Sequence, residues 1–283
     1  MIDRLAILGV GLLGGSIALA ARARGVARRI VGVGRNLDRL GPALAAGAID
    51  HATTEVRAAV RDADVVVLAA TVAANDAWLP RVWEAAPATA LVTDVGSTKR
   101  SIARVAEALR VGRREVQFVG SHPMAGSERS GYGAARADLF EGATVVVTST
   151  DASEPRAVKA VVGLWEALGA RVVTLDPDAH DRAVAAISHL PHLVAWALAD
   201  AVARAEPGAR DVAGAGFRDT TRIAASDPRV WRDILLANAD ALGPALAAFR
   251  TALAELESLV ATGDGAALEA ALARIKAFRE SVR

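Results

Sequence analysis

Short apolar runs separated by polar turns fill the first 175 residues of the chain. The run at residues 64–69 is rich in β-branched side chains, as is typical of a strand buried on both faces. Segments with helical periodicity lie between such runs. This alternation predicts an α/β domain with a mostly parallel sheet. The predicted strands are residues 4–8, 29–33, 64–69, 91–95, 115–120, 144–148 and 171–175, and the clearest helices start at residue 17 or cover 37–46 and 154–168.

The periodicity becomes helical after residue 175 and stays so for nearly the rest of the chain. Asp176-Pro177-Asp178 marks the predicted boundary, so we expect domains at residues 1–175 and 176–283. The apolar faces of the later helices exceed what one short bundle must bury, which favours a homodimer through this helical domain. The predicted helices are residues 179–205, 231–260 with an interruption near Gly243 and Pro244, and 266–282.

The segment ILGVGLLGGS near the N-terminus places a G-x-G-x-x-G spacing between the first predicted strand and the first helix. Gly9 permits the sharp turn, Gly11 leaves room for a pyrophosphate, and Gly14 lets the helix lie close to the strand. The backbone N–H groups of Leu12 and Leu13 would face the phosphates. The spacing in this context indicates dinucleotide binding.

A glycine-rich turn without a ligand and a signal peptide are the two alternatives for this segment. The glycine spacing, the lack of a basic region before the apolar run and the strand that follows argue against a signal peptide. The predicted fold is therefore a Rossmann-like, mostly parallel sheet domain followed by an all-α domain.

Two positions bear on the choice of nicotinamide cofactor. Gly34 stands 20 residues after Gly14, where an NAD-binding fold usually places an acid for the ribose 2′-hydroxyl. Arg35 could instead pair with a 2′-phosphate. We therefore expect NADP or NAD, with NADP favoured by this pair of residues. Thr71 follows the strand at 64–69, at the sheet edge where ligands bind, and is a further candidate cofactor contact.

Composition narrows the class of partner. A net charge of +1 and 4% aromatic residues provide neither the basic field nor the stacking surfaces of a nucleic-acid-binding protein. No uninterrupted apolar run reaches the roughly 18 residues of a membrane span, and the chain has no cysteine for a disulfide or a thiolate site. We expect a cytoplasmic protein with a small-molecule substrate, no nucleic acid and no membrane.

Four of the five histidines, at positions 122, 180, 189 and 192, lie in the irregular stretch at 121–142 or in the first helix of the helical domain. His189 and His192 are three apart, as in some metal sites. No cysteine or suitable set of carboxylates accompanies them, so no metal is predicted. Hydrogen-bonded structural histidines are one alternative, and a polar pocket between the two domains is the hypothesis that we prefer.

Several short motifs occur together in a fixed order behind the glycine turn. They are DVGS at 94–97, GSHPMAGSE at 120–128, HD at 180–181 with SHLPH at 188–192, and FRDTTRIA at 217–224 leading through DP at 227–228 to WRD at 231–233. With this set the chain resembles the prephenate and arogenate dehydrogenases of tyrosine biosynthesis over about its whole length. The combination is far more specific than any one motif.

The resemblance implies an oxidative decarboxylation in which hydride leaves the hydroxyl-bearing ring carbon for the nicotinamide and carbon dioxide leaves the opposite carbon. This needs a proton acceptor, cations for two carboxylates and a closely held nicotinamide. By the resemblance His122 is the acceptor, suited by a neutral imidazole near its ordinary pKa. Ser97 would orient His122 and the nicotinamide, although Ser97 or Thr98 is also placed to cap the helix that ends at Leu109.

The remaining site residues are also implied by the resemblance. Arg222 corresponds to the family's carboxylate-binding arginine. Arg218 stands where many prephenate-using relatives have lysine, which leaves that contact and the choice between prephenate and arogenate open. The other expected pocket residues are His180, His192, Ser127 and Trp231.

Two other function classes remain as rivals. A β-hydroxyacid or imine-type dehydrogenase shares the fold but generally uses a lysine or another donor from its helical domain, and here that region holds only Lys276. A regulatory nucleotide-binding protein would keep the fold without turnover. The chain ends after the helical domain with no fused mutase or regulatory domain, so any inhibition by tyrosine is expected to act at the active site.

Overall fold

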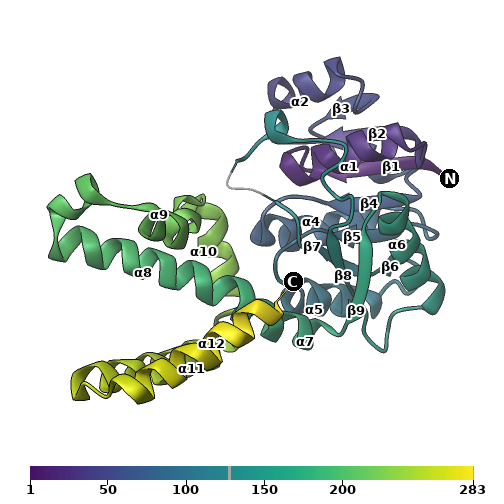
Figure 1. Cartoon of the computed structure of the whole chain (residues 1–283). Helices are drawn as coiled ribbons and strands as arrows, with labels where there is room; N and C mark the ends of the chain where they lie inside the picture. The colour runs from purple at the N-terminus through teal and green to yellow at the C-terminus, as the bar shows by residue number, and fades with distance from the viewer. Residues whose placement is uncertain (127–128, 283) are drawn as a thin grey trace. The chain divides into compact units, whose positions relative to one another are not determined.

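The first six strands form one parallel sheet. The computed structural model describes residues 1–126 and 129–282, and its sheet has the order β3-β2-β1-β4-β5-β6 (Figure 1). This is the strand order of dinucleotide-binding domains, in which ligands bind at the carboxyl ends of the strands where the order reverses, here between β1 and β4. The strands are β1 (Ile2–Leu8), β2 (Ala27–Val33), β3 (His51–Thr53), β4 (Val65–Leu68), β5 (Leu91–Asp94) and β6 (Gln117–Phe118).

Helices cover both faces of this sheet. Successive residues of β1 point to opposite faces: Leu5 and Ile7 pack with α1 and α6, whereas Ala6 and Leu8 pack with α3, α4 and α5. All four side chains are fully buried, which explains the continuous apolar runs of the sequence. The helices are α1 (Leu12–Ala23), α2 (Leu37–Ala45), α3 (Val56–Val60), α4 (Val72–Ala85), α5 (Arg100–Arg110) and α6 (Pro155–Ala167). The predicted α/β class is confirmed.

A second, three-stranded sheet contains β7 (Gly120–Pro123), β8 (Thr144–Thr148) and β9 (Arg171–Leu175). β7 runs antiparallel to β8, with His122 opposite Val146, and β8 runs parallel to β9. The expectation of one strand at 115–120 followed by an irregular stretch is therefore wrong. Two short strands of different sheets meet there, and β7, with the sequence GSHP, lacks the apolar pattern by which strands are predicted. A short 3-10 turn, η1 (Tyr132–Ala134), follows.

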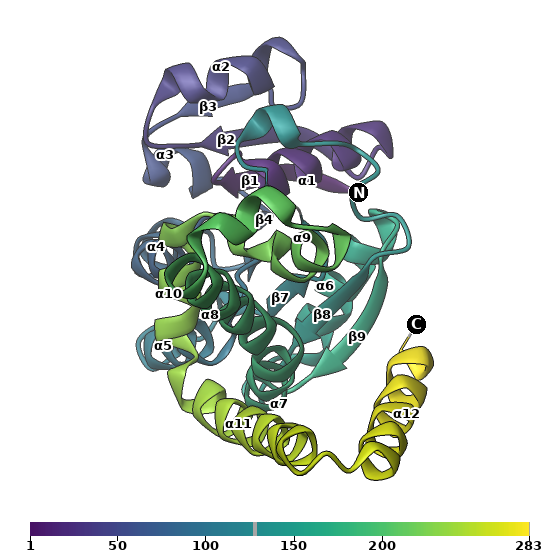
Figure 2. The ribbon, with the colours of Figure 1, turned by 60° about the vertical axis from the view of Figure 1, so that its left-hand side comes forward.

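The helical part begins at α7. A first compact unit runs from Met1 to Asn238 and a second begins at Ala239. In the first unit α8 packs against α9 and η4 (Figure 2), and in the second α11 contacts α12. The elements are α7 (Pro177–Val184), the π-turn η2 (Ala185–His189), α8 (Leu190–Ala205), η3 (Pro207–Val212), α9 (Ala215–Thr221), η4 (Arg222–Ala225), α10 (Pro228–Ala237), α11 (Ala239–Thr262) and α12 (Gly265–Ser281).

One expectation for the helical part needs correction. The predicted interruption near Gly243 and Pro244 is wrong, because α11 runs through Pro244. The helix is interrupted at Asn238 instead, between α10 and α11. The alanine-rich and leucine-rich sequence on both sides continues the helix through the proline. One helical stretch, Pro177–Ala205, is long and apolar enough to cross a membrane, by length and composition only. A search for uninterrupted apolar runs does not detect it.

Candidate functional site

Three glycines build the turn between β1 and α1. Gly9 has a φ of 102°, and a Cβ there would lie 2.5 Å from the backbone oxygen of Ala69. A Cβ on Gly14 would lie 2.0 Å from the oxygen of Gly9. A Cβ on Gly11, in contrast, would contact no protein atom, so packing does not require glycine there. Together with the N-terminus of α1, which has no side-chain cap, this open approach fits a pyrophosphate.

The other predicted cofactor residues follow the carboxyl ends of neighbouring strands. Leu12 and Leu13 form the first turn of α1, and Arg35 is exposed in the turn after β2. Thr71 follows β4 and caps α4 through a bond that its Oγ1 accepts from the N–H of Ala74 at 3.4 Å. These residues therefore lie along one edge of the parallel sheet.

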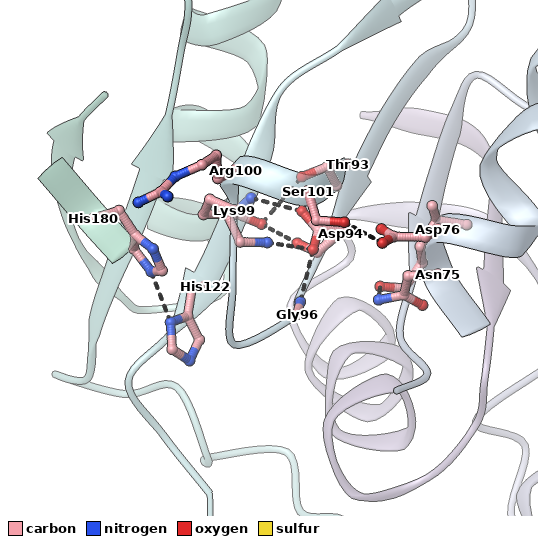
Figure 3. Close-up of polar contacts among 12 residues, drawn as sticks. Asn75, Asp76, Thr93, Asp94, Gly96, Lys99, Arg100, Ser101, His122 and His180 are labelled. Carbon is pink, nitrogen blue, oxygen red and sulfur yellow. Dashed lines mark hydrogen bonds and ion pairs between the residues drawn. The ribbon is translucent and has the colours of Figure 1, made fainter. Parts of the chain in front are cut away.

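Asp94 organises the turn that follows β5. Its carboxylate forms an ion pair with Lys99, and both side chains are buried (Figure 3). The carboxylate also accepts hydrogen bonds from the backbone N–H of Gly96 at 2.8 Å and of Ser121 at 3.2 Å. The hydroxyl of Ser121 donates to the backbone oxygen of Asp94 at 2.5 Å. Because Ser121 precedes His122 on β7, these bonds fix His122 relative to the end of β5.

His122 is enclosed, with 9% of its surface exposed. Its Nδ1 lies 2.9 Å from Nε2 of His180. Figure 3 marks this bond with a dashed line. Burial holds the pKa of His122 well below 6.5, and the basic groups of His180, Lys99 and His189 lower it further. The expectation of an ordinary pKa is therefore wrong. The imidazole is neutral at neutral pH, so it can still accept a proton.

Helix α5 receives its N-terminal cap from α7. The carboxylate of Asp181 accepts the backbone N–H of Lys99 at 2.8 Å and that of Arg100 at 3.0 Å. The predicted cap by Ser97 or Thr98 is wrong, since the helix begins at Arg100 and both hydroxyls precede its N-cap residue, Lys99. Within residues 1–126 and 129–282, the buried Thr98 hydroxyl has no hydrogen-bond partner.

His189 lies in the π-turn η2 and is buried. Its Nδ1 is 3.0 Å from Nδ2 of Asn238, which also donates to the backbone oxygen of Asp181 at 2.8 Å. Burial lowers the pKa of His189 to about 4, a shift that Asp181 opposes and the neighbouring histidines increase. No group of three or more potential metal ligands occurs in the part of the chain that the structure describes.

An aromatic cluster of His192, Trp196 and Trp231 joins α8 to α10. The His192 ring stacks on Trp231 at 3.5 Å between centroids, and Trp196 meets Trp231 edge-on at 5.6 Å. Trp196 Nε1 donates to the backbone oxygen of Ala224 at 2.7 Å, which ties η4 to the cluster. Burial lowers the pKa of His192, and the positive charge of Arg222, at the start of η4, lowers it further. Arg222 thus lies in the same short turn as Ala224, which the cluster holds.

The structure thus brings the predicted site residues together in two groups. His122 and His180 lie in a buried polar cluster together with Asp94, Lys99 and Asp181, which were not predicted. His192 and Trp231 lie in the aromatic cluster, to which the turn that begins at Arg222 is bonded. Arg218 is exposed on α9. Ser97 is half-buried in the turn before α5, and no hydrogen bond joins it to His122 among the described residues. Ser127 lies outside the described residues.

Sequence reasoning gave no role to Asp94, Lys99 or Asp181. Lys99 could have been noticed, because only three of the 33 basic residues are lysine, at positions 99, 159 and 276. Asp181 offered a weaker signal, as an acid directly beside a motif histidine. The contacts of Asp181 with Lys99 and Arg100 join residues about 80 positions apart, and no local pattern reveals such a pairing.

Comparison with known proteins identifies relatives over the whole length. Residues 17–174 match the family model described as prephenate dehydrogenase, nucleotide-binding domain, and residues 176–274 match prephenate dehydrogenase, dimerization domain. The prephenate dehydrogenase of Bacillus subtilis is 38% identical over 85% of this chain and 65% of its own length.

Two solved structures are similar throughout. The prephenate dehydrogenase of Aquifex aeolicus, in complex with hydroxyphenyl propionate and NAD+, has a TM-score of 0.93 at 32% identity and covers 100% of this chain and 99% of its own. The arogenate dehydrogenase of Synechocystis has a TM-score of 0.84 at 30% identity and covers 99% and 100%. On these matches, and with its buried histidine beside a dinucleotide-binding edge, the chain belongs to the prephenate dehydrogenase family of nicotinamide-dependent oxidoreductases in tyrosine biosynthesis.

Proposed function

We propose that this chain itself carries out the reaction of its family, the oxidative decarboxylation of prephenate or arogenate. The observation that carries the proposal is His122. Its neutral imidazole is held through Nδ1 by His180, next to the turn that Asp94 fixes after β5. A base in this place lies near the sheet edge where a nicotinamide binds. The relatives named for prephenate and arogenate support both substrates.

In this proposal His122 accepts the proton of the substrate hydroxyl, and the bound nicotinamide accepts the hydride. Arg222 binds a substrate carboxylate through its fork of donors, which suits its exposed place beside the aromatic cluster. His192 and Trp231 form the wall of the pocket next to it. The further residues assigned to the site are Ser97, which orients His122 and the nicotinamide, Ser127 and Arg218, which line the substrate pocket, and His180, which bonds to His122.

For the cofactor we propose NADP in preference to NAD. The glycine turn and the first turn of α1 (Gly9, Gly11, Leu12, Leu13, Gly14) hold the pyrophosphate, and Thr71 contacts the cofactor at the adjacent strand end. Arg35 is exposed after β2, where it can reach a 2′-phosphate. The A. aeolicus enzyme was solved with NAD+, so the preference rests on Gly34 and Arg35 of this chain.

The chain is also proposed to be a cytoplasmic homodimer, with a nucleotide-binding domain at 1–175 and a substrate and dimerisation domain at 176–283. The match of residues 176–274 to a dimerization domain supports the dimer. So do exposed apolar side chains such as Leu236, Val260 and Phe278, which are 72%, 65% and 72% exposed. Light scattering of the wild type and of Phe278→Glu tests this, with a dimer expected for the first and a smaller species for the second.

The test of the activity is formation of reduced nicotinamide by the purified protein. Prephenate and arogenate are each offered with NAD and with NADP, and Arg35→Ser serves as the variant for cofactor choice. Turnover in any combination supports the enzyme, and a loss confined to NADP in Arg35→Ser supports the cofactor proposal. A folded protein that binds a dinucleotide but turns over neither substrate would favour the regulatory rival.

A further inference from the structure

The side chains of Asp181, His180 and His122 form a continuous chain of hydrogen bonds. Asp181 Oδ1 lies 2.8 Å from His180 Nδ1, and His180 Nε2 lies 2.9 Å from His122 Nδ1. His180 and Asp181 are fully buried. Figure 3 shows the ring of His180, on α7, bonded to one nitrogen of the His122 ring. His180 therefore lies on the Nδ1 side of His122.

The surroundings of Asp181 determine its charge. Burial alone would raise the pKa of Asp181, but hydrogen bonds from His180 and from the backbone N–H groups of Lys99 and Arg100 lower it below 3.8. Asp181 is therefore an anion at neutral pH. Both of its oxygens can only accept hydrogen bonds.

The direction of each bond follows from that charge. Facing a carboxylate acceptor, His180 Nδ1 must carry a hydrogen and donate it. Burial keeps the pKa of His180 below 6.5, so the ring is neutral and its Nε2 holds a lone pair. His122 Nδ1 must then be the donor in the second bond. The unprotonated nitrogen of His122 is left as Nε2, on the side of the ring away from His180.

We propose that His180 and Asp181 are positioning residues that hold His122 in its Nδ1–H tautomer, so that Nε2 is always ready to accept the substrate proton. The inference rests on the proposed function of His122. The substrate O–H bond breaks, its proton joins Nε2, and its electron pair forms the carbonyl as the hydride leaves for the nicotinamide. The resulting imidazolium still donates through Nδ1 to His180, whose own Nδ1–H faces the Asp181 carboxylate, so an anion two bonds away stabilises the new charge.

A purely structural role is the competing explanation, because Asp181 also caps α5. The His180→Leu variant separates the two roles, since it removes the acceptor for His122 Nδ1 and leaves the two backbone bonds to Asp181 in place. His180→Gln is its conservative partner, with a side-chain oxygen able to accept in place of Nε2. Asp176→Ala is the matched control, because the Asp176 side chain caps the same helix through the N–H of Ala179. The bond from the N–H of His180 goes to the backbone oxygen of Asp176, which the substitution keeps.

The first measurement reads the tautomer directly. Full-length protein labelled with ¹⁵N-histidine is examined by long-range proton–nitrogen correlation NMR at neutral pH, and His122→Asn assigns the His122 signals. We expect the Nδ1–H tautomer in the wild type and in Asp176→Ala, and a mixture of tautomers in His180→Leu. An Nε2–H tautomer in the wild type, or no change in His180→Leu, would overturn the proposal.

The second measurement is kinetic. In His180→Leu we expect kcat to fall at least about tenfold, towards the roughly 10²-fold loss of a general base, with KM within about twofold. His180→Gln should recover most of kcat, and Asp176→Ala should keep it. An unchanged kcat, or a raised KM alone, contradicts the role. If the wild type does not turn over, the proposed function fails, and the NMR result still decides the tautomer.

Discussion

The buried polar cluster and the aromatic cluster are held in different ways. In the first, Asp94 and Asp181 are tied to backbone N–H groups, and the side chains are buried. In the second, His192 and Trp231 are half-buried and meet by ring stacking, with an exposed arginine alongside. Directional bonds in a water-poor setting fix atoms precisely, whereas stacked rings tolerate small shifts. The difference supports the proposed division of roles, with proton transfer in the first cluster and substrate recognition in the second.

Replacing the proposed base should give the largest effect. His122→Asn removes the acceptor nitrogen, so kcat is expected to fall at least about 10²-fold, while the affinity for the dinucleotide is kept. Steady-state kinetics and dinucleotide titration check this. His51→Asn, at an exposed position on β3, is the control. Near-normal turnover in His122→Asn would show that neither His122 nor the buried polar cluster takes part in proton transfer.

His189 should make stability depend on pH. It lies between the two clusters, because its ring meets Trp231 edge-on at 5.9 Å and Asn238 bonds both His189 and Asp181. Its pKa is about 4 in the folded chain and near 6.5 when unfolded, so between these values the unfolded state binds more protons. The free energy of unfolding should therefore be greatest above pH 6.5 and fall by up to about 3 kcal/mol as the pH drops to about 4. The pKa values of His122, His180 and His192 are lowered too and act in the same direction.

Urea unfolding at several pH values measures that slope. His189→Asn should reduce it, and the same substitution at the exposed His51 is the matched control. If the slope is the same in His189→Asn and in the wild type, the burial of His189 is not what makes stability depend on pH.

Arg222 should affect recognition more than chemistry. Arg222→Ala removes a charged hydrogen-bond donor, worth roughly 1.5–3 kcal/mol, so KM is expected to rise about 10- to 100-fold with kcat little changed. Arg229→Ala, at an exposed arginine of α10, serves as the control. A loss in kcat with an unchanged KM would move Arg222 from recognition to the chemical step.

The smallest effect is expected from the ring stack. Trp231→Leu removes a contact worth about 0.5–1.5 kcal/mol, so KM should rise about two- to tenfold. Trp231→Phe, which keeps an aromatic ring, should lie closer to the wild type. Equal kinetics in Trp231→Leu and in the wild type would show that His192 needs no aromatic partner.

Much of the α/β part could be predicted from sequence because its information is local. The buried run of β4 and the glycine turn each carry their own pattern within a few residues. β7 could not be predicted, since GSHP becomes a strand through Asp94 and β8 rather than through its own propensity. The prediction of the α5 cap failed for the same reason. Ser97 and Thr98 are nearby in sequence, whereas the structure uses the carboxylate of Asp181, far along the chain.

For the candidate site, the sequence motifs could indicate which residues lie close together, but not which hydrogen bonds join them. His180 was predicted to be a pocket residue. Its contact with Nδ1 of His122 depends on the course of α7, which the sequence does not reveal. The spacing of His189 and His192 assumed a regular helix, whereas the π-turn alters the register between them. Errors of this kind arise wherever tertiary contacts decide the orientation of a side chain.

The cap that Asp181 supplies to α5 has a consequence for synthesis on the ribosome. The backbone N–H groups of Lys99 and Arg100 are made long before the carboxylate that satisfies them, since α7 lies about 80 residues further along the chain. The start of α5 therefore receives its cap only after α7 has emerged. A fragment that stops at residue 175 would leave the start of α5 without this cap, so that end of the helix is expected to fray.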